Sequence, residues 1–306
     1  MNRYFIITID TEGDNLWAVS DIHQRITTEN AKYLFRFQEL CEKYHFIPTY
    51  LTNYEMAQDR AMIELGLEGL KNHTLEIGSH EHAWNSPPYF PLIKRPIKRG
   101  KPYLGEYPKC IIRKKLEYLT KTLEDTFQCE IKSHRGGRWC LNDNIIDELC
   151  SLQYEVDCTC TPGISWESNP GWSLGSRGTN WKKYNNHPFV LKPKHDSNGL
   201  GYNLIEVPVT SISKAEGNPS WFRPNGNNLP ELLGLIDYIF KDSSVDYIEF
   251  MLHSSELMPG GSPTFKLKGQ IDSLYKDLDT VFNELVKDNY VGIGLTDYSR
   301  IIRKKG

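Results

Sequence analysis

The chain lacks long apolar segments, a strong net charge and a regular cysteine pattern. No apolar run approaches the roughly 18 to 20 residues that span a bilayer, so we expect no membrane insertion. A formal net charge of -3 over 306 residues gives no general attraction for nucleic acid or anionic membrane surfaces. Seven cysteines at irregular spacing fit a reducing compartment better than a disulfide framework.

The first residues also lack the features of a secretory signal. A strand-like run from Tyr4 to Ile9 stands where a charged region, an apolar core and a small-residue cleavage site would be needed. Together with the cysteines, this predicts a cytoplasmic protein. Hydrophobic residues at 39% and aromatic residues at 12% are enough for a substantial core, so we expect a globular chain.

Apolar runs alternate with segments of helical period, which predicts an α/β fold with parallel strands. We expect one domain over residues 1–306, with a last helix at 269–287 and a frayed basic tail at 301–306. Two stretches interrupt the alternation. Residues 86–108 predict a long loop or lid, and residues 161–203, rich in Gly, Asn, Trp and Pro, predict an irregular insertion beside the cleft.

Two imidazoles stand two residues apart after a short apolar run. Because residues i and i+2 point to the same side of a β-strand, His80 and His82 could hold one metal ion together. Asp10 and Glu12 follow the first strand, and a third imidazole, His253, ends a later one. A lone histidine at a strand end is more often structural, but this combination predicts a hydrolytic metal site.

Four motifs coincide with the ends of expected strands. They are Thr8-Ile-Asp10-Thr-Glu12-Gly, Glu76-Ile-Gly-Ser-His80, Arg135-Gly-Gly-Arg138-Trp139 and Met251-Leu252-His253. In this order they resemble the motifs of the NodB-type polysaccharide deacetylases, carbohydrate esterase family 4. Any one motif alone would be weak, but their ordered succession is specific.

Further stretches resemble one branch of that superfamily, the WbmS-like proteins of bacterial surface-polysaccharide (O-antigen) clusters. They are His80-Glu-His82-Ala-Trp84-Asn85-Ser-Pro-Pro88, Glu155-Val-Asp157-Cys-Thr-Cys-Thr161-Pro162, Glu206-Val-Pro-Val-Thr210 and His253-Ser-Ser-Glu256-Leu-Met-Pro-Gly-Gly-Ser-Pro263. The resemblance covers most of the chain. It implies a distorted (β/α) barrel with fewer than eight repeats, and one divalent metal ion, usually zinc, held by a carboxylate and two histidines.

Carried over residue by residue, the resemblance makes His80 the first metal histidine. The family's second histidine comes four positions later, where this chain has Trp84, so His82 is the nearest replacement. The two adjacent aspartates of the first motif are reduced to Asp10. We expect Glu12 to be the metal carboxylate and Asp10 the general base, and the reverse assignment stays open.

The resemblance also implies the remaining roles. A divalent ion polarises the acyl carbonyl and lowers the pKa of a bound water, while Asp10 accepts the proton of that water. His253 protonates the leaving amine or alcohol, a task for a group that titrates near pH 7. Arg135 or Arg138 orients the base, and Asp157 holds the acid histidine.

Aromatic and polar residues near these motifs predict a carbohydrate-binding pocket. For Tyr54 and Trp139, core packing is an equal alternative, and the same holds for the tryptophans of the insertion. The residues expected to contact substrate are Tyr54, Trp84, Asn85, Arg138, Trp139 and Leu252.

The leading hypothesis is therefore a metal-dependent hydrolase that removes an N- or O-acyl group from a sugar, acting on a precursor of a surface polysaccharide. One alternative is an inactive relative that binds glycans, motivated by the displaced histidine and the missing second aspartate. Another is an amidohydrolase acting on a non-sugar amide, since fold alone does not fix function. The sequence specifies neither the sugar and acyl group nor the native metal and oligomeric state.

Overall fold

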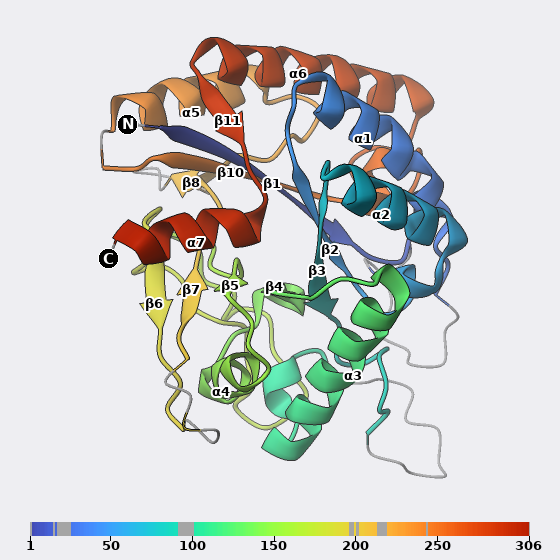
Figure 1. Ribbon diagram of the computed structural model, residues 1–306, viewed down its shortest axis with the longest axis vertical. Coiled ribbons are helices and arrows are strands. Elements are labelled where there is room, and N and C mark those ends of the chain that lie inside the picture. Colours follow the sequence, from blue (N-terminus) through green and yellow to red (C-terminus); the bar gives the residue numbers. More distant parts are fainter. Residues whose placement is uncertain are drawn as a thin grey trace.

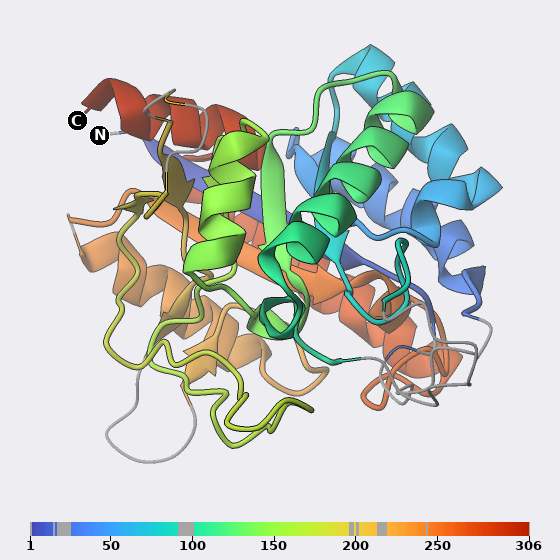
Figure 2. The same ribbon diagram turned by 90° about the horizontal axis from the view of Figure 1, so that it is seen from below.

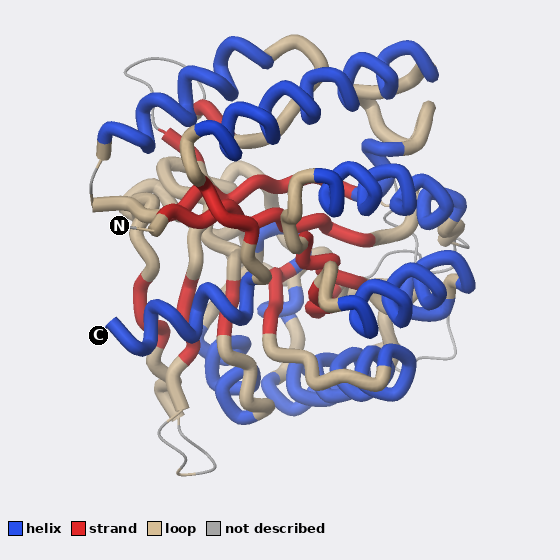
Figure 3. The backbone as a smooth tube through the Cα atoms, turned by 45° about the horizontal axis from the view of Figure 1, so that its top comes forward, coloured by secondary structure: helices blue, strands red, loops and turns tan. Residues whose placement is uncertain are grey.

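Parallel strands form a curled sheet at the centre of the molecule in a computed structural model (Figures 1 and 3). The structure describes residues 2–14, 16, 26–90, 101–195, 199, 202–212, 219–242 and 244–305. Within these residues the neighbouring parallel strands are, in order, β10 (Tyr247–His253), β1 (Arg3–Thr11), β2 (Pro48–Thr52), β3 (Glu76–Glu81), β4 (Ser133–Gly136), β5 (Val156–Asp157) and β7 (Leu204–Glu206).

The central strands are buried on both faces, as is usual for parallel sheets covered by helices. In β1 every residue from Phe5 to Thr11 is buried, and all five residues of β2 are buried. This burial explains why these strands read as continuous apolar runs in the sequence. A short strand, β11 (Tyr290–Gly292), which the sequence did not predict, pairs with the start of β1.

Helices surround the sheet on its outer face (Figures 1 and 3). Their apolar residues recur at helical spacing, as Leu274, Leu278 and Phe282 do in α6, and these side chains are buried against the sheet. The six helices of this layer are α1 (Leu34–Lys43), α2 (Arg60–Asn72), α3 (Lys109–Phe127), α4 (Asp143–Ser151), α5 (Leu229–Lys241) and α6 (Lys268–Lys287).

The chain after β7 joins the two ends of the curled sheet. β6 (Phe189–Leu191) is antiparallel to β7. Beyond β7, the N–H of Val207 donates to the carbonyl of Asp157 at 2.8 Å, and the N–H of Thr210 donates to the carbonyl of Glu249 in β10 at 3.3 Å. The segment therefore crosses from β5 to β10, which gives the distorted, partly closed barrel that the sequence predicted.

The final described helix, α7 (Leu295–Lys305), covers the amino ends of the strands (Figures 1 and 2). Tyr298 donates to Asp246 at 2.7 Å, Arg300 donates to Glu155 at 2.8 Å, and the N–H of Thr296 donates to Glu76 at 3.0 Å. These three carboxylates lie near strand starts. The prediction of a frayed tail at 301–306 is therefore wrong for residues 301–305, while residue 306 lies outside the described residues.

The predicted loop and insertion contain little regular structure. Residues 91–100 of the loop lie outside the described residues, and its remainder carries a short 3-10 turn, η3 (Leu104–Glu106). In the insertion, isolated bridges join Ser165 to Asn180 and Pro170 to Arg177. After β7, β8 (Ser211–Ile212) pairs with β9 (Ser220–Trp221). No described helix is both long and apolar enough to cross a membrane.

Candidate active site

The carboxyl ends of the parallel strands bring the predicted chemical groups to one edge of the barrel. Asp10 lies near the end of β1, His80 near the end of β3, Arg135 in β4, and His253 is the last residue of β10. Asp10 is the register partner of His253, and His80 is that of Arg135. Parallel strands end on the same side, so this edge is where an α/β barrel normally carries its chemistry.

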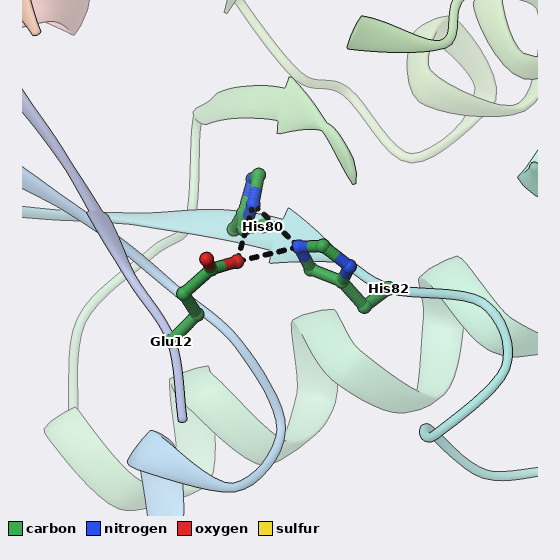
Figure 4. Close-up of side chains that lie close together, drawn as sticks. All are labelled: Glu12, His80 and His82. Carbon is green, nitrogen blue, oxygen red and sulfur yellow. Dashed lines mark hydrogen bonds and ion pairs between the residues drawn. The ribbon is translucent and has the colours of Figure 1, made fainter. Parts of the chain in front are cut away.

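Glu12, His80 and His82 converge on one point at this edge (Figure 4). Oε2 of Glu12 lies 2.6 Å from Nε2 of His82 and 3.4 Å from Nε2 of His80, and the two Nε2 atoms are 2.9 Å apart. All three residues are buried. Oδ2 of Asp10 lies farther from His80, at 3.9 Å. The geometry therefore favours Glu12 over Asp10 as the third ligand.

The donor set fits a divalent ion. Ligand atoms on a tetrahedral zinc would lie roughly 3.4 Å apart. The Glu12–His80 separation of 3.4 Å matches this value, and the other two, at 2.6 and 2.9 Å, are shorter. Nδ1 of His80 lies 3.0 Å from the carbonyl of Arg135, which places the ring proton on Nδ1 and leaves the Nε2 lone pair for the site. Burial lowers the pKa of His82, and Glu12 only partly opposes this effect. Burial also acts to raise the pKa of Glu12, but the two histidines outweigh it and hold the pKa of Glu12 well below its ordinary value. Glu12 as a carboxylate and His82 as a neutral imidazole are the forms that bind metal.

Asp10 faces Arg135 on one side and His253 on the other. Nη1 of Arg135 donates to Oδ1 of Asp10 at 2.6 Å, and Nη2 of Arg135 donates to Oε1 of Glu249 at 2.6 Å. Burial opposes the charged form of Asp10, but Arg135, then His80 and His253, lower the pKa of Asp10 overall. Its carboxylate is thus held in the form that accepts a proton. Of the two candidate arginines, Arg135 makes this contact.

His253 lies between two acidic residues. Its Nε2 is 3.6 Å from Oδ2 of Asp10, and its Nδ1 is 3.2 Å from Oε2 of Glu256. Arg223 also binds Glu256, with 2.8 Å between Nη2 and Oε2. Burial raises the pKa of Glu256, but Arg223 and His253 outweigh it and bring the pKa to about 2. Sequence reasoning missed Arg223 and Glu256, although Glu256 stands three residues after His253.

The prediction that Asp157 holds His253 is wrong. Oδ2 of Asp157 instead lies 2.6 Å from Nδ1 of His134, a buried histidine that sequence reasoning did not consider. The two residues are register partners on β5 and β4. Oδ1 of Asp157 accepts the N–H of Thr159 at 2.9 Å. Its carboxylate is thus engaged within the barrel, and Glu256 occupies the position beside His253.

A pocket of about 250 Å³ opens over these groups. Three predicted substrate residues, Trp84, Arg138 and Trp139, contribute to its lining. Trp139 stacks on Trp166 of the insertion, with ring centroids 6.2 Å apart and planes at 9°. The residues that line the pocket are Asp10, Glu12, Leu16, His80, His82, Trp84, Tyr103, Gly136, Arg138, Trp139, Trp166, Asn169, Arg223 and His253.

The other three predicted substrate residues lie outside this lining. Leu252 is fully buried in the hydrophobic core, because its side chain points to the opposite side of β10 from that of His253. Tyr54 packs on Tyr118, with ring centroids 5.8 Å apart. Asn85 is buried beyond Trp84 in the turn that follows β3. Leu252 is therefore a core residue and not a substrate contact, while the substrate contacts of Tyr54 and Asn85 stay predictions.

No protein-family model and no curated protein matches the chain. Solved structures do. A polysaccharide deacetylase candidate from Mycobacterium smegmatis is 14% identical, with a TM-score of 0.61, over 100% of this chain and 92% of that chain. A glycoside hydrolase/deacetylase candidate from Parabacteroides distasonis is 13% identical, with a TM-score of 0.65, over 100% of this chain and 72% of that chain. Puue allantoinase is 10% identical, with a TM-score of 0.54, over 97% of this chain and 88% of that chain.

At these identities the likeness establishes the fold. The chain has the distorted (β/α) barrel of the NodB-type polysaccharide deacetylases, and the expected fold is confirmed. An allantoinase has a similar barrel, so the fold by itself does not fix the substrate. The chemistry must be argued from the groups at the carboxyl edge.

Proposed function

We propose that this protein is a metal-dependent hydrolase that removes an N- or O-acyl group, in the first instance acetyl, from a sugar. The observation that carries the proposal is the convergence of Glu12, His80 and His82 beside the Asp10 and His253 pair. These groups lie at the carboxyl edge of a barrel with the polysaccharide deacetylase fold. We treat residues 1–306 as one catalytic domain.

A divalent ion, for which zinc suits two imidazoles and a carboxylate, would polarise the acyl carbonyl and lower the pKa of a water toward neutrality. Asp10 is the general base: Arg135 engages its Oδ1, and its Oδ2 faces His253. His253 is the general acid that protonates the leaving nitrogen or oxygen. Trp84, Arg138 and Trp139 line the space in which the sugar would lie.

We further propose that the substrate is a precursor in the synthesis of a bacterial surface polysaccharide. The resemblance of the motifs to the WbmS-like branch supports this choice. A cytoplasmic location, expected from the cysteine usage, is compatible with a nucleotide-linked or lipid-linked sugar. Finished wall polymer would be out of reach of an enzyme there.

Metal content tests the central claim. Elemental analysis of the purified protein should find about one divalent ion per chain, lost in a His80→Ala, His82→Ala double variant. His195→Ala is the matched control, because the His195 side chain is 76% exposed. A double variant that retains the ion would remove the assigned roles of both histidines. Acyl release from sugars, measured as free acetate or formate, is the assay that follows.

A second candidate is an amidohydrolase acting on a non-sugar amide, which the similarity to Puue allantoinase supports. Profiling acetate, formate and ammonia released from acyl sugars and from small amides separates the two. A third is a glycan-binding protein without hydrolysis, motivated by Trp84 at the position of the family's second histidine. It predicts sugar binding by a metal-free chain, so one tightly held ion would count against it.

A further inference from the structure

No carboxylate of the described residues neutralises the guanidinium of Arg138 at the pocket. Arg223, which also lines the pocket, binds Glu256 at 2.8 Å. Arg135, beneath the pocket, binds both Asp10 and Glu249 at 2.6 Å. Arg138 forms no ion pair with any residue that the structure describes. Its guanidinium carbon instead lies 5.4 Å from the ring centroid of Tyr103.

The backbone holds Arg138 at this position. Arg138 has φ 57° and ψ 27°, and Trp139 has φ 59°, so two consecutive residues with side chains adopt the left-handed region. Trp139 is fixed by stacking on Trp166 and by an edge contact with Trp221, whose ring centroid is 5.6 Å away. Tyr103 donates to the carbonyl of Asn169 at 2.9 Å. The guanidinium therefore rests on a ring that is itself anchored.

The acidic residue nearest in sequence to Tyr103 has other partners. Oε1 of Glu106 accepts the N–H of Trp172 at 2.7 Å and that of Ser173 at 2.6 Å, and its Oε2 accepts the N–H of Tyr103 at 3.1 Å. This carboxylate thus ties the loop to the insertion and forms no ion pair with Arg138. Within the described residues, the positive charge at this side of the pocket is left for a ligand.

We propose that Arg138 recognises an anionic group, a carboxylate or a phosphate, on the acylated sugar. The inference rests on the proposed function and names its substrate class. An arginine fork binds both anions with paired hydrogen bonds, and the rings of Trp139 and Trp166 offer a surface for the sugar ring. Arg138 and the Glu12, His80 and His82 set line the same small pocket. One sugar unit can therefore place its acyl group at the metal set and its anion at Arg138.

Binding measurements with three related sugars test the proposal. The probes are N-acetylglucosamine, its uronic acid and its 1-phosphate, titrated by calorimetry against metal-loaded wild type and against Arg138→Gln and Arg138→Lys. Arg177→Gln is the matched control, because Arg177 is an exposed arginine of the insertion outside the pocket lining. A divalent ion also attracts anions, so every variant is compared at the same metal content, and differences between variants then report the side chain.

We expect wild type to bind at least one anionic sugar about tenfold or more tightly than the neutral sugar. Arg138→Gln should remove that preference and leave the neutral sugar unchanged, Arg138→Lys should keep part of it, and Arg177→Gln should have no effect. The preferred anion then identifies carboxylate or phosphate. Equal affinity for all three sugars in wild type, or an equal loss for charged and neutral sugars in Arg138→Gln, overturns the proposal.

The same experiment separates this inference from the proposed hydrolysis. If the charged sugar binds through Arg138 but no acyl group is released from any probe, the substrate class stands and the hydrolytic function fails. If neutral acyl sugars are hydrolysed with no preference for an anion, the hydrolytic function stands and the role of Arg138 fails.

Discussion

Nε2 of His253 lies 3.6 Å from Oδ2 of Asp10, although the two residues come from opposite ends of the described chain. They meet because β1 and β10 are neighbours and pair these residues in register. On the far side of the ring, Nδ1 of His253 faces Glu256. Oε2 of Glu256 lies 3.2 Å and Nη2 of Arg223 lies 3.1 Å from this Nδ1, so the two side chains hold the ring with Nε2 directed to the site.

Glu256 should act on catalysis by positioning His253. We expect Glu256→Gln to lower kcat for acyl release about 10- to 100-fold with a smaller change in KM, because it weakens the orientation of the acid and Glu256 itself does not line the pocket. Steady-state kinetics on metal-loaded protein measures this, and Glu284→Gln on the exposed side of α6 is the control. An unchanged kcat in Glu256→Gln, with metal content equal to wild type, would contradict the role.

The same carboxylate should make stability depend on acid pH. The pKa of Glu256 falls from 4.5 to about 2 in the folded protein, so its contribution is present above pH 4.5 and is lost as the pH falls toward 2. The shift corresponds to about 3 kcal/mol at neutral pH. Urea unfolding of wild type and Glu256→Gln from pH 7 to pH 3 should give a difference that is constant above about pH 5 and shrinks below it. A difference that grows as the pH falls would refute this sign.

Arg135 should be essential to the fold of the site. Its side chain is fully buried and binds Asp10 and Glu249, so Arg135→Leu leaves the Asp10 carboxylate buried without its partner. We expect a loss of roughly 3 to 5 kcal/mol in the free energy of unfolding. Burial raises the pKa of Glu249 to about 8, so Asp10 accounts for most of this loss.

Urea unfolding at pH 7 is the measurement for Arg135→Leu. The control is Lys287→Leu, in which the lost pair with Glu284 is 60% and 41% exposed at the two side chains. That variant should lose less than about 1 kcal/mol, since exposed pairs contribute little. Similar losses in the two variants would show that the buried network contributes no more than a surface pair.

Gly137 should be needed for the close approach of β4 to the metal set. A Cβ at this position would lie 2.4 Å from the carbonyl oxygen of Glu81 and 3.3 Å from Cδ2 of His82. Gly137→Ala should therefore displace the end of β3 and weaken metal binding about tenfold or more. Competition with a chelator measures the affinity. Gly234→Ala is the control, because a Cβ there meets no atom within 4 Å. Equal metal affinities in Gly137→Ala and Gly234→Ala would show that the lack of a side chain at Gly137 is not needed for metal binding.

The local elements could be predicted where the sequence carries the decisive signal itself. Helix α6 (Lys268–Lys287) agrees to within one residue with the predicted range 269–287, because its apolar residues recur at helical spacing. The cluster of Glu12, His80 and His82 was also recognisable, since Glu12 follows a buried strand and the two histidines are two residues apart. The helical tail could not be predicted, because its polar residues bind Glu76, Asp246 and Glu155, which belong to distant strand starts.

The partner of His253 could not be chosen from the sequence alone. Asp157 and Glu256 were both possible partners, and the choice depends on strand register. β4 and β5 place Asp157 opposite His134, so the carboxylate of Asp157 binds the ring of His134.

The pocket residues were ambiguous for a different reason. An aromatic residue after a strand packs in the core or faces the cleft according to neighbours that only the fold supplies, as Tyr54 and Trp139 illustrate.

The central place of β1 in the sheet has a consequence for the order of folding. This strand is synthesised before its partners β10 (Tyr247–His253) and β11 (Tyr290–Gly292), which follow more than two hundred residues later. Contacts at such sequence separation form slowly, because a long loop must close first. Asp10 and His253 therefore come together only when most of the barrel has assembled. A chain whose C-terminal strands have not yet docked would contain His80 and His82 but not the pairing of Asp10 with His253.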